Sequence, residues 1–278
     1  MMSSLLHPGI ILILFGLFIP LIKNRLIVLL FPIASFIILI SLDNGTLIKL
    51  DYGNYELILL SIDKLSRLFS YIFLLILFAT AIFSINQDNK SEISSAFVYV
   101  GSSISVVLSG DLITLFIFWE IMAITSTIVI WSGSRQSYYP GIRYLAVHLL
   151  GGSILLIGII GYANTTGSLA FGLMSPDNIF SYFVLAGFLI NAGAPPFSSW
   201  IPDAYPSASW SGTVFLSAFT TKTAVYVLIV GYAGYQFLIY VGIFMIFYGI
   251  IFAILENDMR RILSCLLYTS DAADDMAS

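Results

Sequence analysis

Apolar residues occur along the chain in runs of about twenty, and a helix of that length spans the hydrocarbon core of a bilayer. Short polar stretches separate the runs. Sliding a window of this length along the chain predicts about nine transmembrane helices. They lie at approximately 5–22, 26–42, 66–85, 94–109, 112–131, 143–163, 179–200, 211–230 and 236–255. The pattern therefore predicts an all-α polytopic membrane protein.

The polar connection at residues 43–63 has a different pattern. It holds the short alternating runs TLIKL and YELILL on either side of Gly53 and Asn54, an arrangement that favours a β-hairpin outside the membrane. The connection ends in SIDKLSRLF, where Asp63 precedes the next apolar segment. We expect Asp63 to be the N-cap of that helix.

Lysine and arginine are shared unequally between alternate loops. One set of loops holds Lys23, Arg25, Lys90, Arg135, Arg143, Arg260 and Arg261. The other set holds Lys49, Lys64 and Arg67. Because basic residues accumulate in cytoplasmic loops, this bias predicts that the N-terminus and the 43–63 loop are outside and that Arg260 is cytoplasmic.

The seventh segment carries the irregular stretch NAGAPPFSSWIPDAYP. Four prolines occur in it, among them Pro195 and Pro196, and a proline in a helix interior removes one hydrogen bond and crowds the preceding turn. Non-helical backbone at membrane depth is tolerated where it is enclosed by protein or lines a hydrated cavity. The sequence predicts a broken seventh helix with a functional role.

A single carboxylate, Glu120, lies at the centre of the 112–131 segment. Ionisable residues at this depth are costly, and they usually face a bundle interior or a water-filled path. Ala123 and Thr127 share its helix face and leave room for water or a neighbouring helix. We interpret Glu120 as a proton carrier, with a structural ion pair between helices as the alternative.

Lys222 is the matching base, in the middle of the 211–230 segment and among threonines. Burial favours its neutral amine and a nearby carboxylate favours its charged form, so its charge depends on its neighbours. The pair of buried acid and buried base suggests a proton relay. The alternative is a lysine whose side chain extends to the membrane–water interface, and it requires the ammonium to reach that interface from the middle of the helix.

Three further polar residues are candidates. His148, in RYLAVHLLGGSILLIG, suits a proton shuttle by its usual pKa, although a hydrogen-bonded core histidine is an equal alternative. Asp111 and Asp203 lie at span ends, where helix capping or gating is as good an interpretation as transport.

Composition narrows the function classes. Of the 278 residues 59% are hydrophobic and 9% charged, and the net charge is −4, which gives no support for nucleic-acid binding. The single cysteine, Cys265, excludes a disulfide framework or a cysteine-rich metal site held by this chain alone. Phosphate-binding, zinc-protease and nucleotide-binding motifs are missing, so we expect no cofactor, and transport is favoured over self-contained catalysis.

The chain divides into three predicted parts. Residues 1–105 form N-terminal transmembrane helices with the external loop 43–63, and residues 106–264 form the transport domain. After ENDMRRILS the chain changes to CLLYTSDAADDMAS, which has no apolar period. We interpret residues 265–278 as a non-native or frameshifted tail, with the natural protein continuing further.

Four segments carry a family resemblance: FWEIMAITS, WIPDAYPSA, FTTKTAVYVL and ENDMRRILS. They resemble the antiporter-like subunits of Mrp-type multisubunit Na+/H+ antiporters, respiratory complex I and membrane-bound hydrogenases, and are most similar to the D-type component of the antiporters. The resemblance covers about residues 57–264. It implies a proton channel built from two inverted repeats, each with a broken helix. Glu120 looks like the family's glutamate of the fifth helix and Lys222 like its lysine of the eighth, with His148 on the hydrated axis between them.

The chain departs from this family pattern in two respects. Asn191 stands where the family usually has a lysine in the seventh helix, and Ser198 and Ser199 stand where a histidine is frequent. Coupling is therefore expected to use Lys222 or a water chain near Asn191. The family also carries several more helices after ENDMRRILS, so the chain is expected to be C-terminally truncated and to hold the first repeat and the start of the second.

The leading prediction is a proton-translocating membrane subunit of a multisubunit cation (Na+)/proton antiporter. Its expected partners are other membrane subunits of a hetero-oligomer, the lipid bilayer, H+ and, as the candidate exchanged cation, Na+, in a bacterial-type plasma membrane. A proton-pumping subunit of an NADH-quinone oxidoreductase or membrane-bound hydrogenase is the first alternative. A non-transporting membrane scaffold, with Glu120 and Lys222 as a locked ion pair, is the second.

Overall fold

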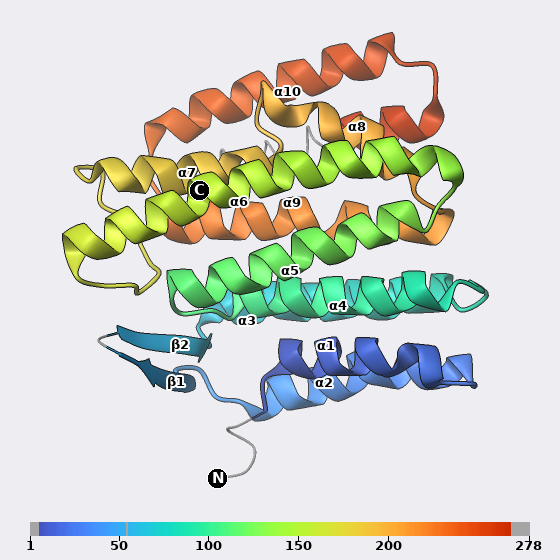
Figure 1. The fold of residues 1–278 in the computed structure, drawn as a ribbon, viewed down its shortest axis with the longest axis horizontal. Helices are drawn as coiled ribbons and strands as arrows, with labels where there is room; N and C mark the ends of the chain where they lie inside the picture. Colours follow the sequence, from blue (N-terminus) through green and yellow to red (C-terminus); the bar gives the residue numbers. More distant parts are fainter. Residues whose placement is uncertain (1–5, 54, 268–278) are drawn as a thin grey trace.

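The computed structural model describes residues 6–53 and 55–267, and it is a bundle of long helices that run side by side, with a small sheet at one end (Figure 1). The helices are α1 (Pro8–Phe18), α2 (Leu30–Ser41), α3 (Lys64–Phe83), α4 (Lys90–Val107), α5 (Leu112–Trp131), α6 (Tyr138–Thr166), α7 (Ile179–Ala192), α8 (Trp200–Ala204), α9 (Trp210–Tyr232) and α10 (Gln236–Leu255). Short 3₁₀ turns join several of them: η2 (Ile19–Leu21), η3 (Arg25–Leu29), η4 (Arg135–Ser137), η5 (Phe197–Ser199) and η6 (Tyr205–Ser207). The all-α polytopic prediction is confirmed.

Six helical segments of the described residues are long and apolar enough to cross a membrane. They comprise α3, α5, α6 with its preceding 3₁₀ turn, the broken segment from α7 to η6, α9 and α10. The predicted spans at 5–22 and 26–42 correspond to shorter apolar helices. The predicted span at 94–109 corresponds to α4, and the one at 179–200 covers α7, the break after it and the first residue of α8. The count of nine spans stays a prediction.

The serine-rich helix α4 lies inside the bundle. All but three of its 18 residues are buried, and it packs closely on α1 and α5. Several of its serine hydroxyls donate to carbonyls of the same helix, for example Ser102 Oγ to Val98 O at 2.8 Å and Ser105 Oγ to Gly101 O at 2.9 Å. A moderately polar helix is therefore stable here, because protein and not lipid surrounds it.

The predicted hairpin is confirmed: β1 (Leu47–Tyr52) pairs antiparallel with β2 (Tyr55–Ser61). Asp63 forms a capping box with Ser66 at the start of α3, as expected. The hairpin is attached to the bundle by backbone hydrogen bonds to the α4–α5 turn, where Gly110 N donates to Ile58 O at 2.9 Å. It marks one end of the bundle (Figure 1).

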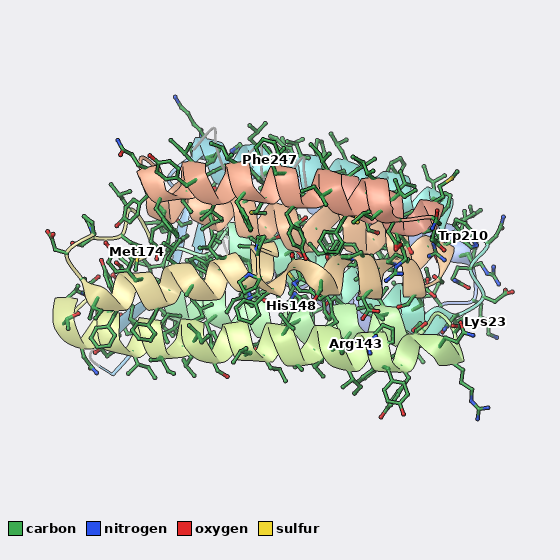
Figure 2. All side chains as sticks on the ribbon, turned by 90° about the horizontal axis from the view of Figure 1, so that it is seen from above. Lys23, Arg143, His148, Met174, Trp210 and Phe247 are labelled. Carbon is green, nitrogen blue, oxygen red and sulfur yellow. The ribbon has the colours of Figure 1, made fainter. Side chains whose placement is uncertain are left out.

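The loops rich in lysine and arginine lie together at the opposite end. Lys90 Nζ donates to Ile22 O at 2.7 Å, and Arg25 pairs with Asp88. Figure 2 shows Lys23 and Trp210 at this end and Met174 at the hairpin end. The two sets of loops are therefore separated in space as the charge bias requires, and the orientation across a membrane stays a prediction.

The predicted break in the seventh segment is confirmed. α7 ends at Ala192, and Gly193 follows with φ +82°, a left-handed conformation that glycine adopts without steric cost. After Pro195 and Pro196 the chain resumes as the 3₁₀ turn Phe197–Ser199 and the short helix α8. Gly193 ends the helix before the proline pair, and the break separates α7 from α8.

The predicted division of the chain is not tested by the fold. Its boundary between residues 105 and 106 falls in the last turn of α4. Residues 259–267 are helical, and residues 268–278 of the predicted tail lie outside the described residues.

Candidate functional site

Glu120 and Asn191 contact consecutive glycines of α6 from two different helices. A Cβ atom built on Gly152 would collide with Glu120 Oε1, so only glycine leaves room for the carboxyl group as it is placed. A Cβ atom on Gly151 would lie 3.2 Å from Asn191 Nδ2 and 3.3 Å from its Oδ1. The glycine pair thus lets α5 and α7 bring two polar side chains against the same turn of α6.

Several buried polar atoms around this turn have no hydrogen-bond partner among the described residues. They are Glu120 Oε1, His148 Nε2 and both side-chain polar atoms of Asn191. Buried polar atoms in native proteins are nearly always hydrogen-bonded, to protein or to ordered water, because an unpaired group costs about 1–3 kcal/mol. These atoms are therefore the groups near this turn that could hydrogen-bond with water.

His148 lies about midway along the bundle, one turn of α6 before the glycine pair (Figure 2). Its Nδ1 lies 2.9 Å from Tyr144 O, and its ring stacks on Tyr144 with centroids 3.9 Å apart. The Trp200 ring of α8 packs edge-on against it at 4.7 Å. The ring is therefore held firmly, with Nε2 as its remaining hydrogen-bonding atom.

A chain of buried hydroxyl groups crosses four helices beside this cluster. Ser126 Oγ of α5 lies 2.8 Å from Tyr144 OH of α6, which lies 3.5 Å from Thr220 Oγ1 of α9. Thr220 Oγ1 in turn lies 2.7 Å from Tyr99 OH of α4. The sequence alone did not single out Ser126 or Tyr99, because hydropathy treats such residues as ordinary members of an apolar span.

Lys222 lies on the same helix as Thr220, and its contacts there do not include Glu120. Its Nζ donates to Ser217 O at 3.1 Å and to Thr221 Oγ1 at 3.3 Å. Glu120 Oε1, by contrast, belongs to the unpartnered atoms described above. The contacts found for Lys222 among the described residues join it to its own helix, and the locked Glu120–Lys222 pair of the scaffold alternative stays a prediction.

The two aspartates at span ends have structural partners. Asp111 caps α5 by accepting from Ile113 N and Thr114 N at 2.9 and 2.8 Å, and its Oδ2 also accepts from Ile58 N of β2 at 2.6 Å. Asp203 of α8 forms a bidentate pair with Arg143 of α6, at 2.7 and 2.9 Å. The structure thus favours capping for Asp111 and a helix-to-helix clamp for Asp203.

A small cavity of about 170 Å³ lies beside the helix break. It is lined by Ser198, Ser199, Ile201, Pro202, Tyr248, Gly249, Phe252, Glu256, Arg261 and Cys265. Ser198 Oγ is buried and has no hydrogen-bond partner within the described part of the chain. The break at Pro195 and Pro196 therefore leaves a buried, unpaired hydroxyl on a residue that lines this cavity.

Glu92 is a fully buried carboxylate that the sequence did not indicate. It lies in the first turn of α4 and accepts hydrogen bonds from Ser209 Oγ at 2.6 Å, Ser211 Oγ at 2.5 Å and Gln87 Nε2 at 3.1 Å. Its partners come from the start of α9 and from the loop before α4. In the sequence, Glu92 looks like an ordinary solvent-exposed residue in the first turn of a helix. The one signal for its burial is its spacing of seven residues from Tyr99, which places the two side chains on the same helix face.

Comparison with known proteins places this arrangement in a family. Residues 109–265 match the family model described as NADH:quinone oxidoreductase/Mrp antiporter, TM. The chain is 31% identical over 261 residues to Na(+)/H(+) antiporter subunit A1 of Staphylococcus aureus (strain bovine RF122 / ET3-1), with 81% of this chain and 32% of that protein covered. Another Staphylococcus aureus subunit A1 is 29% identical over 304 aligned residues, covering 94% of this chain and 38% of the relative. These relatives are A1 subunits, whereas the motifs favoured the D-type component of the same family.

Solved structures share the fold. A chain of the Mrp complex from Dietzia sp. DQ12-45-1b superposes with a TM-score of 0.84 at 20% identity, covering 99% of this chain and 58% of that one. A chain of the membrane-bound sulfane sulfur reductase, an archaeal respiratory membrane complex, gives 0.85 at 22% identity, covering 98% and 51%. A chain of respiratory complex I from Thermus thermophilus with bound aureothin gives 0.80 at 17%, covering 96% and 62%. The chain spans about a third of the length of its curated relatives and between half and two thirds of these structural neighbours.

Proposed function

Because the chain belongs to the NADH:quinone oxidoreductase/Mrp antiporter transmembrane family, we propose that it is the proton-carrying membrane subunit of a multisubunit cation/proton antiporter. The cation that we propose is Na+, after the name of the curated relatives. Its partners are other membrane subunits, as in the complexes named for the similar structures. Its location is a bacterial-type cell membrane.

One observation supports this proposal above the others: Glu120 has a buried, unpartnered carboxyl oxygen in a cluster of other unpartnered polar atoms of the described residues. A carboxyl group in such surroundings is able to exchange a proton with water that enters the cluster. A permanently paired carboxylate has no such freedom. Glu120 would bind and release the proton, and His148 and Asn191 would hold the water that delivers it.

Lys222 is the second proton-binding group in this proposal. It lies on α9, and the contacts of its ammonium include a backbone carbonyl and a hydroxyl, both neutral acceptors. The Tyr144 hydroxyl of α6 contacts both of their helices, at Ser126 Oγ of α5 and Thr220 Oγ1 of α9. Protonation of the carboxylate and of the amine in turn would move one proton past this region, and cation entry would reset the pair.

A proton-pumping subunit of a redox complex is the second candidate. The similar folds in a respiratory membrane complex and in respiratory complex I favour it, because the same intramembrane groups would serve either machine. The two candidates differ in their partner subunits and in the source of energy. Proton movement driven by added Na+ without any electron donor supports the antiporter, and proton movement only during electron transfer supports the redox complex.

The test uses the complete complex in inverted membrane vesicles, with a fluorescent dye that reports the pH gradient. Glu120→Gln keeps the size of the side chain and removes its titration, so we expect dissipation of the gradient by added cation to be lost. The matched control is Glu56→Gln, which changes a half-exposed carboxylate of the hairpin that pairs with Lys49. Normal assembly with unchanged cation-driven proton movement in Glu120→Gln would refute the proposal, and loss of assembly with normal flux in the remaining complex would favour a scaffold.

A further inference from the structure

Tyr99 of α4 makes two hydrogen bonds to a single residue of α9. Its hydroxyl oxygen lies 2.7 Å from Thr220 Oγ1 and accepts a hydrogen bond from the Thr220 backbone N–H at 2.8 Å. Both residues are fully buried. A backbone N–H inside an α-helix faces the carbonyl four residues earlier, so a phenol within reach of it has entered the hydrogen-bond ladder of the helix. Tyr99 thus contacts the backbone of α9 as well as its side chains.

The same turn of α9 holds the ammonium of Lys222. Lys222 Nζ donates to Ser217 O at 3.1 Å, a carbonyl whose regular helical partner is the N–H of Thr221. Thr221 supplies the second acceptor through its hydroxyl at 3.3 Å. The position of the ammonium therefore depends on the geometry of the turn between Ser217 and Thr221, the turn that Tyr99 contacts from α4.

Aromatic packing fixes the turn from the side. The Phe219 ring lies edge-on to Tyr99, with centroids 5.8 Å apart, and edge-on to Phe73 of α3 at 5.3 Å. Phe219 is fully buried. The Tyr99 ring therefore packs the turn while its hydroxyl bonds the backbone, and a Tyr99→Phe substitution removes the second contribution alone.

We propose that Tyr99 is a positioning residue for Lys222. Its hydroxyl holds the Ser217–Thr221 turn of α9 in the geometry that presents the Ser217 carbonyl to the lysine ammonium. The Thr220 hydroxyl also contacts Tyr144 OH, which connects this turn of α9 to α6. The inference deepens the proposed function, and it rests on that function for the role of Lys222 in transport, whereas the effect of Tyr99 on the placement of Lys222 stands on the contacts alone.

The test compares two variants of this contact with a matched control on the same helix. Tyr99→Phe removes the phenol hydroxyl, and Thr220→Val removes its side-chain partner at nearly constant shape. The control is Tyr232→Phe, which removes another buried phenol hydrogen bond of α9, from Tyr232 OH to Ser181 O at 2.6 Å, ten residues beyond Lys222. All three are made in the complete complex, and the amount of assembled complex is measured first.

Lys222 itself provides the direct readout. A membrane-permeant, amine-reactive reagent is added to assembled complex, and modification of the Lys222 peptide is followed over time by mass spectrometry. We expect Tyr99→Phe to change the modification rate about fivefold, which corresponds to one hydrogen bond of ordinary strength, and to lower cation-driven proton movement per complex to a similar extent. Thr220→Val should change both quantities in the same direction, and Tyr232→Phe should change neither by more than its effect on assembly.

Equal modification rates and equal transport in Tyr99→Phe and Tyr232→Phe would overturn the proposal. If Tyr99→Phe fails to assemble, Thr220→Val decides by the same two measurements. A separate variant, Lys222→Met, tests the proposed function. If Lys222→Met leaves transport unchanged while Tyr99→Phe still changes the modification rate of Lys222, the proposed function fails and the positioning role of Tyr99 stands.

Discussion

Glu120 of α5 and Asn191 of α7 approach the same turn of α6, each against one of two consecutive glycines. The carboxyl group of Glu120 occupies the space that a side chain at Gly152 would need, and the amide of Asn191 lies against Gly151. The side chains from α5 and α7 thus use the space left by the two glycines, which carry no side chain. The glycine pair makes the site possible as much as the charged residue does.

Gly152→Ala is expected to impair transport more than folding. The added methyl group collides with the tip of the Glu120 side chain, which is able to rotate away, so the cost in stability stays within about 1–3 kcal/mol. The carboxyl group then leaves the cluster formed with His148 and Asn191. We expect cation-driven proton movement per complex to fall at least about tenfold, a change equivalent to about 1.4 kcal/mol in the barrier.

The control for this prediction is Gly172→Ala. A Cβ atom at Gly172 has no neighbour within 4 Å among the described residues, and the residue has no positive φ. Its transport rate should match that of the unmodified complex. Equal rates in Gly152→Ala and Gly172→Ala, at equal assembly, would show that the position of the Glu120 carboxyl group does not limit transport.

Asn191→Leu is expected to lower transport without lowering the stability of the protein. The two side-chain polar atoms of Asn191 have no protein partner within the described structure, so a leucine of similar size breaks no hydrogen bond to another described residue. The variant should be as stable as the unmodified protein or more so, measured as the unfolding midpoint in detergent. Transport should fall, because water then loses two hydrogen-bonding atoms.

An unfolding midpoint that drops strongly in Asn191→Leu would instead indicate that Asn191 is held by ordered partners essential to the fold. Asn191→Asp serves as the companion variant, since it keeps a polar side chain of the same shape. Unchanged transport in the leucine variant would remove Asn191 from the water path.

Arg143 and Asp203 are expected to contribute little to stability. Their contact is bidentate and joins α6 to α8, but the Arg143 side chain is 57% exposed and that of Asp203 28% exposed. Exposed ion pairs contribute about 0.2–1 kcal/mol, because water and salt screen them. A double-mutant cycle with Arg143→Gln and Asp203→Asn in detergent should give a coupling energy in this range, and the coupling should weaken at high salt.

A transport defect in Asp203→Asn that Arg143→Gln does not share would contradict this structural assignment. It would mean that Asp203 acts on the transported ion and not through its partner on α6. The same measurement on both single variants therefore distinguishes a clamp from a gating residue.

The positions of the long helices follow from hydropathy because each has sharp polar ends. The predicted spans 112–131 and 236–255 coincide with α5 and α10, and Asp111 caps the first of them as its place in the sequence suggests. The start of α4 is different, since the helix begins at Lys90, four residues before the predicted span. A hydropathy window stops at Glu92 because it treats every carboxylate as exposed, whereas tertiary partners bury this one.

The sequence indicates the charged residues of the candidate site but not how they are arranged. Glu120 and Lys222 stand out because each is a lone charge in an apolar span. Glu120 contacts α6 and Lys222 contacts its own helix, and the hydroxyl groups of Ser126, Tyr144 and Thr220 connect the helices that carry them. This arrangement depends on how the helices pack. Tyr99 and Ser126 stand out only through their hydrogen bonds to Thr220 and Tyr144 on other helices. Periodicity within a single helix does not reveal such partners.

Glu92 is expected to hold the start of α9 against α4. Its carboxylate accepts from Ser209 Oγ, Ser211 Oγ and Gln87 Nε2, and Ser209 is the N-cap of α9, where a negative charge is stabilised by the helix dipole. Glu92→Leu leaves these three donors without their acceptor, each at a cost of about 1–3 kcal/mol unless water replaces it. We expect a clearly lower unfolding midpoint in detergent and faster amide hydrogen exchange in the first turns of α9.

Glu92→Gln provides the graded comparison, because an amide oxygen in the place of Oε1 still accepts from both serines, whereas an amide NH₂ in the place of Oε2 no longer accepts from Gln87 Nε2. It should lose less stability than Glu92→Leu, and Ser94→Ala on the same helix, which breaks a hydrogen bond to Gly16 O at 2.8 Å, controls for general loosening of α4. If Glu92→Gln assembles normally, exchanges its α9 amides at the original rate and yet loses transport, Glu92 takes part in proton movement and the purely structural assignment is wrong.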